Sequence, residues 1–311
     1  MSAVYGAITG ARNQLHDRGL LRSRPLQGPV ISVGNLSAGG SGKTPFVILL
    51  GELLKAPEIK FDILSRGYGR KSRGVLLVDP GGVARDFGDE PLLMARRLQV
   101  PVIVGEDRYD AGVLAESKFG PQIHLLDDGF QHRGLARDFD IVLVTPEDAR
   151  DHLLPAGRLR EPLQSLRRAD AVVLASGASQ DSFPLQNKRV WRVRRGIVTQ
   201  NVPHRPVVFC GIARPQHFLL QLRTAGIEPA AEAFFRDHHA YTERDVRDLL
   251  QLRQRSDAGG FITTEKDAIN LGGYLDALAP LAVVQVTMEL ADAANVMDTM
   301  LRVIDERRGR S

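Results

Sequence analysis

The chain lacks most of the features that mark secreted, membrane-spanning or nucleic-acid-binding proteins. A single cysteine, Cys210, excludes an intrachain disulfide framework and favours a reducing compartment. No apolar run reaches the roughly 18 to 20 residues that cross a bilayer, and the first residues lack the apolar core of a signal peptide. The excess of four positive charges is too small to indicate a nucleic acid partner. We therefore expect an intracellular globular protein.

Short apolar runs dominate the first half of the chain and predict an α/β fold. Runs such as "VISVGN", "FDILSRG", "QIHLLDDG" and "FDIVLVTP" alternate with helical patterns from Val30 to about Ala175. Several are apolar throughout, as strands buried on both faces are. This rhythm predicts a mostly parallel sheet flanked by helices, similar to that of the P-loop nucleotide-binding proteins.

The pattern changes after residue 176, and 311 residues with 43% apolar content are enough for two units. A polar linker leads into "RVWRVRRGIVTQNV", which predicts two short strands that meet near Gly196. A second, smaller α/β unit follows, and the last helix packs back on either unit. The expected boundaries are 1–25 for an N-terminal helix, 26–176 for the core unit, 177–205 for the two-stranded linker, 206–290 for the smaller unit and 291–311 for the C-terminal helix.

A glycine-rich turn, "GNLSAGGSGKTP", follows the first buried strand. It departs from the phosphate-loop pattern GxxxxGK[ST] because Ser37 stands at the first glycine position. The three later glycines still allow close backbone approach and inward N–H groups, and a serine is tolerated if its φ stays negative. A strand before the turn and a helix after it favour nucleotide binding over a turn without a ligand. The predicted ATP contacts are Ser37, Ala38, Gly39, Gly40, Ser41, Gly42, Lys43 and Thr44.

Magnesium is the expected companion of a nucleotide in such a loop. Lys43 is expected to reach the β and γ phosphates, and the Thr44 hydroxyl to bind the metal. The strand in "QIHLLDDGFQH" ends in Asp127 and Asp128, two adjacent carboxylates that repel each other unless a cation lies between them. We expect Asp127 to bind magnesium and Asp128 to serve the reacting groups. A solvated turn is the alternative.

Two further segments carry candidate acid or base groups. Asp89, in "FGDEP", is either an ordinary helix N-cap or a catalytic base. A base needs a partner, and "FFRDHHAYTERD" offers His238 and His239, which point in opposite directions if the backbone is extended. The residues alone leave both questions open.

The N-terminal stretch is amphipathic at helical spacing. Val4, Ile8, Ala11 and Leu15 share one face, and basic residues lie nearby. Two interpretations are open: a helix that lies in a membrane interface, and a helix that packs on the core.

Taken together, the motifs resemble those of the tetraacyldisaccharide 4'-kinases. "GNLSAGGSGKTP", "LSRGYGR", "GDEP", "VGEDR", "LLDDGFQH", "LLPAGRLREP", "FCGIARPQHF", "DHHAYT" and "TTEKDA" occur in that family's order and spacing, over about residues 1 to 290. The resemblance implies transfer of the γ-phosphoryl group of ATP, with Mg²⁺, to the 4'-hydroxyl of the lipid A disaccharide 1-phosphate. It also implies peripheral attachment to the cytoplasmic face of the bacterial inner membrane. No nucleic acid partner is expected, and nothing requires more than a monomer.

The resemblance also assigns roles to individual residues. It implies that Asp89 is the general base, paired with a histidine of the DHH segment, which we take to be His238. It implies that the first 25 residues dock on the membrane. Arg12, Arg18, Arg22 and Arg24 would then lie near anionic headgroups. It further connects six residues with the active site, in roles that are less defined: Arg108, Gln131, His132, Arg160, Glu161 and His239.

Two rival functions are weighed against the kinase. A nucleotide-dependent switch or metal-insertion chaperone would be favoured by a guanine-binding NKxD motif or a cysteine and histidine cluster, and the sequence contains neither. A kinase for a soluble sugar or nucleoside is disfavoured by the amphipathic N-terminal stretch. The lipid kinase is therefore the preferred interpretation.

Overall fold

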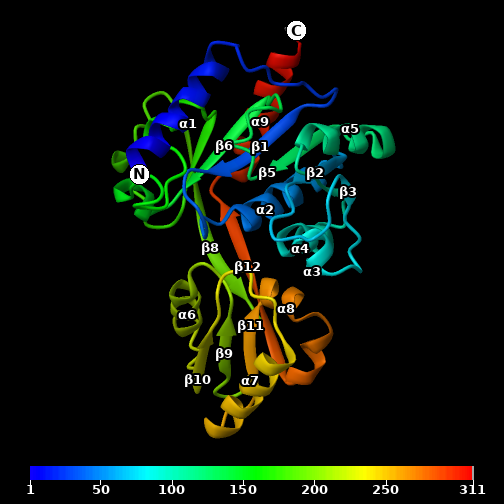
Figure 1. The fold of residues 1–311 in the computed structure, drawn as a ribbon, viewed down its shortest axis with the longest axis vertical. Coiled ribbons are helices and arrows are strands. Elements are labelled where there is room, and N and C mark those ends of the chain that lie inside the picture. Colours follow the sequence, from blue (N-terminus) through cyan, green and yellow to red (C-terminus); the bar gives the residue numbers. More distant parts are fainter. Residues whose placement is uncertain (310–311) are drawn as a thin grey trace.

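A computed structural model describes residues 1–309, so the last two residues of the expected C-terminal segment, 310 and 311, lie outside the described part. Two α/β units are stacked along the long axis of the molecule and joined by a ribbon of two long strands (Figure 1). All strands form one continuous sheet in the order β10-β9-β11-β12-β8-β7-β6-β1-β5-β2-β4-β3.

The first unit is built on the parallel strands that the apolar runs predict. Strands β1, β5 and β6 are buried along their whole length. Strand β3, at the outer edge of the described sheet, pairs antiparallel with β4. Its strands are β1 Val30–Asn35, β2 Phe61–Ser65, β3 Leu76–Leu77, β4 Val102–Val104, β5 Ile123–Asp127, β6 Phe139–Val144 and β7 Ala171–Leu174.

Helices and loops cover both faces of this sheet. Side chains of α2, α4 and α9 pack against one face in the largest hydrophobic cluster, and α5 packs against the other. The short helices η1 and η2 belong to the segment that covers the second face beside β6 and β7. The helices are α1 Ser2–Asp17, α2 Lys43–Lys55, α3 Ala84–Phe87, α4 Asp89–Leu98, α5 Arg108–Phe119, α9 Ala293–Arg308, η1 Pro146–Arg150 and η2 Leu163–Arg168.

The second unit is a smaller parallel sheet with a helix on each face. Phe218 and Leu222 of α6 pack on one side, and Val246 and Leu249 of α7 pack on the other. The elements are β9 Val207–Cys210, α6 Pro215–Thr224, β10 Ala231–Phe234, α7 Glu243–Arg255, β11 Phe261–Thr264, α8 Glu265–Leu271 and the short helices η3 Gln180–Ser182, in the linker before the unit, and η4 Gly272–Leu278.

The ribbon between the units differs from the sequence prediction. Instead of two short strands meeting near Gly196, residues 189–198 form one strand, β8 (Arg189–Val198), which pairs with β12 (Leu281–Leu290). Gly196 lies opposite Thr287 in this antiparallel ladder, so its backbone stays extended and does not turn the chain. The two strands of the linker therefore come from distant parts of the sequence.

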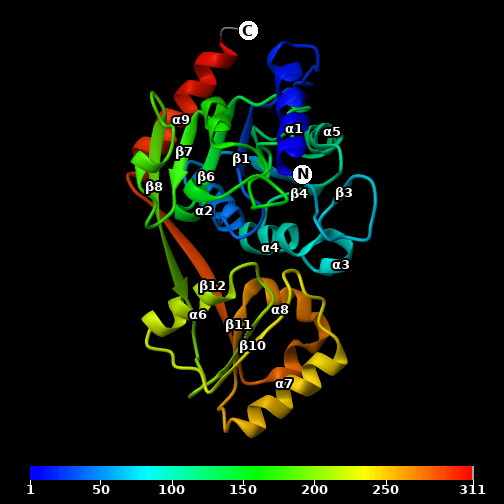
Figure 2. The same ribbon diagram turned by 60° about the vertical axis from the view of Figure 1, so that its left-hand side comes forward.

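Helices α1 and α9, near the two ends of the described chain, both lie on the first unit (Figure 2). Arg308 of α9 binds Asp138 and backbone carbonyls of residues 26–28, so the C-terminal helix packs on the first unit. Within residues 1–309, no helix is both long enough and apolar enough to cross a bilayer.

Candidate active site

The glycine-rich loop lies at the carboxyl end of β1, where the chain turns into α2. Gly39, Gly40 and Gly42 have positive φ values of 73°, 62° and 86°, which glycine adopts without steric cost. Ser37 is not among the residues with positive φ, so the condition under which a serine fits there is met. Its hydroxyl is buried and has no partner within the described residues. The loop thus keeps the backbone shape that a phosphate site needs.

Asp127 ends β5, the strand next to β1, and is fully enclosed. Ser65 donates its hydroxyl to Oδ2 at 2.9 Å, while Oδ1 has no partner among the described residues. Burial and the neighbouring charges of Glu90 and Asp128 raise the pKa of Asp127 to about 7. A buried carboxylate oxygen without a donor suits a divalent cation.

Asp128 follows in the left-handed region, with φ 49°, and is bound by two cations. Arg160 donates to both oxygens, at 2.8 and 2.9 Å, and Nζ of Lys43 lies 3.5 Å from Oδ1. Burial alone would raise the pKa of Asp128, but these charges outweigh it and hold that pKa well below its usual range. Lys43 also donates to Oδ1 of Asn35 at 3.0 Å. The loop lysine is therefore fixed at the strand ends.

Asp89 and His238 are in contact across the two units. Nδ1 of His238 lies 2.8 Å from Oδ2 of Asp89, and the backbone N–H of Glu90 donates to Oδ1. Asn270 and Lys266 of α8 approach the same Oδ2 at 3.3 and 3.9 Å. The N-cap of α4 is Gly88 and Asp89 is the first residue of the helix, so the N-cap interpretation of Asp89 is wrong, and its carboxylate pairs with a histidine instead.

The two groups of this pair influence each other's protonation. Burial opposes ionisation of Asp89, but the hydrogen bond from His238 and the charge of Lys266 lower its pKa to about 2. The hydrogen bond to Asp89 raises the pKa of His238, against the effects of burial and of Lys266. The pair therefore stabilises both the ionised form of Asp89 and the protonated form of His238.

His239 points into the second unit and has a structural role there. Its ring stacks on Phe235 at a centroid distance of 4.7 Å, and Nε2 lies 3.1 Å from Asp245, a residue of the capping box that begins α7. His239 does not line the cavity described next. Of the two adjacent histidines, the structure brings only His238 to Asp89.

A cavity of about 740 Å³ lies between the units and unites these groups. This volume is within the range of small-molecule sites. The glycine-rich loop and Glu90, Asp128 and Arg160 line it from the first unit, and His238 and Lys266 line it from the second. Its apolar wall is formed by Ile48, Leu93, Ile212, Phe218, Val284 and Val286. A nucleotide held by the loop would therefore contact both units.

Three of the predicted site residues with less defined roles, Arg108, Gln131 and His132, do not line the cavity. Gln131 donates to the Asn35 carbonyl at 3.0 Å, and Arg108 is buried at the start of α5. His132 has no side-chain hydrogen bond within the described chain, and burial and the charge of Arg108 lower its pKa to about 4. These residues support the loop that follows Asp128.

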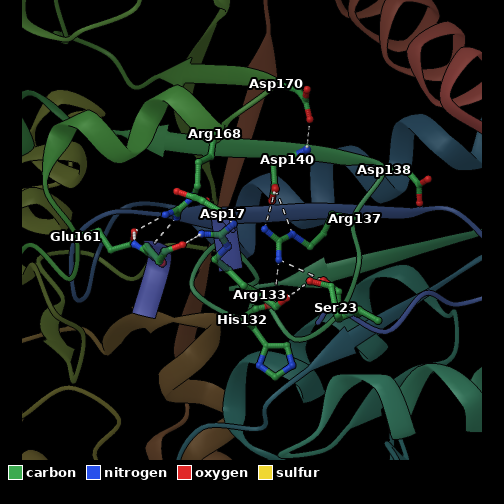
Figure 3. Close-up of polar contacts among 12 residues, drawn as sticks. Asp17, Ser23, His132, Arg133, Arg137, Asp138, Asp140, Glu161, Arg168 and Asp170 are labelled. Carbon is green, nitrogen blue, oxygen red and sulfur yellow. Dashed lines mark hydrogen bonds and ion pairs between the residues drawn. The ribbon is translucent and has the colours of Figure 1, made fainter. Parts of the chain in front are cut away.

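Glu161 lies beside Arg160 in sequence but points away from the cavity, toward α1. Asn13 of α1 donates to it at 2.6 Å, and Arg168 donates to both of its oxygens (Figure 3). The guanidinium of Arg168 in turn lies 4.4 Å from the centre of the Phe130 ring, in the loop after Asp128. Glu161 therefore connects the N-terminal helix to that loop.

Polar contacts hold α1 against the first unit. Arg133 binds Asp17 at 2.8 Å and the Asn13 carbonyl at 3.0 Å, and Arg12 donates to the Gln131 carbonyl (Figure 3 shows the Asp17 end of this contact). No residue of α1 is buried. The apolar side chains face outward instead, with Val4 62% and Ile8 65% exposed.

Comparison with known proteins agrees with this geometry. A sequence profile of the tetraacyldisaccharide-1-P 4'-kinases matches residues 1–305. A tetraacyldisaccharide 4'-kinase of Koribacter versatilis is 49% identical over 99% of both chains, and one of Aquifex aeolicus is 40% identical over 89% of this chain and 90% of its own. The chain belongs to this family.

A solved structure supports the same assignment. The "apo" form of LpxK from Aquifex aeolicus in complex with ATP superposes with a TM-score of 0.79 and 37% identity, over 97% of each chain. The family membership confirms that the chain is a kinase with the α/β fold expected from its sequence.

Several residues in or beside the cavity were not among the predicted site residues. Lys266 and Asn270 of α8 contact Asp89, and Asn35 anchors the loop lysine. The sequence signal for Lys266 is the family motif "TTEKDA". The role of its lysine depends on the packing of α8 against α4, which the motif does not reveal. Arg214, which also lines the cavity, is in another such motif, "FCGIARPQHF".

The buried link through Glu161 predicts a measurable change in α1. In Glu161→Gln, the amide group presents a donor to Asn13 or Arg168, which are themselves donors, at a cost on the order of 1–3 kcal/mol. Amide hydrogens of residues 2–17 should then exchange about tenfold faster, as measured by mass spectrometry. Glu289→Gln, which changes a carboxylate 73% exposed on β12, is the control. Equal exchange of α1 in both variants would show that Glu161 does not hold the helix.

Proposed function

We propose that this chain transfers the γ-phosphoryl group of ATP to the 4'-hydroxyl of tetraacyldisaccharide 1-phosphate, the reaction after which its family is named. The observation that carries the proposal is the cavity that joins the phosphate loop to the Asp89–His238 pair. One wall is suited to hold phosphates, and the other carries a group that accepts a proton. A kinase acting on a hydroxyl needs both.

The reaction follows from the positions of these groups. The hydroxyl oxygen forms a bond to the γ-phosphorus while the bond from that phosphorus to the β–γ bridging oxygen breaks, and ADP leaves with the electron pair. The loop amides and Lys43 stabilise the charge on the phosphates. The hydroxyl proton passes to the Asp89–His238 pair. Arg160 holds Asp128 in place through two hydrogen bonds, and Lys43 lies beside the same carboxylate.

The pair acts as a unit in this proposal, with His238 as the member that reaches the cavity. Asp89 is 4% exposed, and both of its oxygens already accept hydrogen bonds. His238 lines the cavity and its Nδ1 faces Asp89, so Nε2, which lies 3.8 Å from Oδ2 of Asp237, is the nitrogen left for a substrate proton. The sequence favoured Asp89 as the direct acceptor. The geometry favours an arrangement in which Asp89 orients His238.

Magnesium suits two residues of this site: Thr44, which lines the cavity, and Asp127, which precedes the cavity residue Asp128. The orphaned Oδ1 of Asp127 and the Thr44 hydroxyl are hard oxygen donors, and the raised pKa of Asp127 falls when a cation is near. Residues 1–309 contain no group of three or more His, Cys, Asp or Glu side chains that could hold a metal ion. In nucleotide sites, Mg²⁺ is usually bound by one or two protein groups together with the phosphates. When bound, it would neutralise charge on the β and γ phosphates.

We further propose that α1 docks on the cytoplasmic face of the bacterial inner membrane, where the lipid acceptor is found. Val4, Ile8 and Leu15 form an outward apolar face, and Leu20 and Leu21 extend it. Basic residues, among them Arg18 and Arg22, lie beside this face and suit anionic headgroups. Peripheral attachment would bring the 4'-hydroxyl to the cavity without removing the acyl chains from the bilayer.

The phosphoryl transfer itself predicts a dependence on the loop lysine. With labelled ATP and the lipid disaccharide 1-phosphate, the wild type should label the acceptor, and Lys43→Ala should lower kcat by about 10²- to 10³-fold. Lys118→Ala, an exposed lysine on α5, should match the wild type. A deacylated disaccharide tests the acceptor: if it is phosphorylated as efficiently as the lipid, the proposed substrate is wrong.

The Asp89–His238 pair predicts the pH dependence of the rate. Because Asp89 raises the pKa of His238, the histidine is charged below that raised value and cannot accept a proton. The kcat/KM should therefore rise with pH through a midpoint above 6.5, the ordinary value for histidine. His238→Gln should abolish this rise and lower kcat by about 10²- to 10⁴-fold. A wild-type profile that is flat between about pH 5 and 8 would instead support Asp89, with its pKa of about 2, as the sole acceptor.

The exposed face of α1 predicts membrane binding. Ile8→Ser should weaken cosedimentation with phosphatidylglycerol vesicles by about tenfold, since burial of an isoleucine side chain contributes about 1.5–3 kcal/mol. Leu220→Ser changes a side chain on α6 with a similar exposure, 63%, and should have no effect. If the two variants bind vesicles equally well, α1 is not the docking surface.

A further inference from the structure

The second unit contacts the glycine-rich loop through the two residues before α6. A Cβ atom added to Gly39 would lie 3.3 Å from the Cβ of Ala213, and one added to Gly40 would lie 2.9 Å from Nε of Arg214. The arginine side chain thus rests directly on the loop that holds the phosphates. The loop is therefore covered by a cation from the other unit.

The guanidinium of Arg214 is only partly paired. Its Nη1 donates to Oε2 of Glu147 at 3.0 Å, while its Nη2 is buried and has no partner among the described residues. The side chain is only 14% exposed and lines the cavity. A buried N–H group without an acceptor is costly, and a charged one more so. An acceptor inside the cavity would satisfy it.

Another arginine of the cavity lining, Arg195, lacks a partner among the described residues. Arg195, on β8, has no side-chain hydrogen bond or ion pair within residues 1–309. Although Arg195 is exposed overall, partial desolvation and then the charge of Arg214 lower the pKa of its guanidinium, and the two like charges repel each other. Like charges that face one cavity are relieved by an anion between them. The nearest anion site is the phosphate loop.

We propose that Arg214 is a catalytic arginine that the second unit supplies to the nucleotide phosphates, with Arg195 as a second cation beside it. The proposal rests on the proposed kinase function. As the bond between the γ-phosphorus and the bridging oxygen breaks, negative charge grows on that oxygen and on the β-phosphate of ADP. Nη2 of Arg214 donates to this charge, while Glu147 holds Nη1. Arginines in this role are worth about 10³–10⁵ in kcat in other phosphoryl-transfer enzymes.

A purely structural role for Arg214 makes a different prediction. The pair with Glu147 connects α6 of the second unit to η1 of the first, and would serve as a strut between them. Glu147 is 41% exposed, so such a pair is worth at most about 1 kcal/mol, or about fivefold. A strut would lose its effect equally whichever partner is changed. A catalytic arginine would not.

The kinetic test compares variants of both partners in the full-length protein. Arg214→Ala should lower kcat at least about 10²-fold with little change in the KM for ATP, and Arg214→Lys should recover little, because lysine lacks the planar fork. Glu147→Gln should lose less than about fivefold. Arg194→Ala is the matched control, since Arg194 is 85% exposed on the same strand as Arg195.

A binding test reads the same contact without the lipid acceptor. Calorimetry in magnesium buffer measures the affinity for ADP alone and for ADP with aluminium fluoride, which imitates the transferring phosphoryl group. The wild type should bind the fluoride complex at least about tenfold more tightly than ADP, and Arg214→Ala should lose this gain while keeping its affinity for ADP. Arg195→Ala should weaken both complexes.

Two results would overturn the proposal. One is a loss of kcat in Glu147→Gln as large as that in Arg214→Ala, which would establish the strut. The other is an unchanged gain from aluminium fluoride in Arg214→Ala and Arg214→Lys. Failure of the wild type to phosphorylate the lipid would contradict the proposed acceptor alone, because the binding test does not involve it.

Discussion

The parallel pairing of β1 with β5 is the constraint on which the site depends. Its register places Val33 opposite Asp127, so the phosphate loop and the two carboxylates leave the sheet at the same edge. Parallel strands direct their carboxyl ends to one side, and both strands are buried along their length. Packing of apolar side chains on both faces of the sheet thus fixes the distance between the phosphate loop and the carboxylates, which lie far apart in the sequence.

The second unit then completes what the first begins. α4 presents Asp89 at the same edge of the sheet, but its partners, His238 and Lys266, come from the other unit. Ion pairs between Arg97 and Glu265 and between Arg214 and Glu147 bracket the cavity on two sides. The chemistry is therefore a property of the interface, and neither unit contains it alone.

The sequence predicted the parts of the site that are local. The loop and the Asp127–Asp128 pair follow buried strands directly, and a strand, a turn and a helix can be read from neighbouring residues. The Asp89–His238 contact spans 149 positions, so no local pattern encodes it, and only the resemblance to a family suggested it. Glu161 shows a second reason why the sequence predicts the site incompletely. Arg160 and Glu161 are adjacent in one motif, but Arg160 points to the cavity and Glu161 points to α1. Likewise, Gly196 led to the prediction of a turn between two strands. In the structure, β12 holds this glycine extended within the single strand β8.

The course of the chain through the ribbon makes the second unit an insertion within the first. Strand β8 leaves the first unit, and β12 returns to it only after the whole second unit has been completed. Met297, Met300 and Ile304 of α9 then enter the largest hydrophobic cluster, beside side chains of β1 and α2. During synthesis, the nucleotide-binding unit keeps part of its core uncovered until α9 has left the ribosome, whereas the inserted unit can fold first.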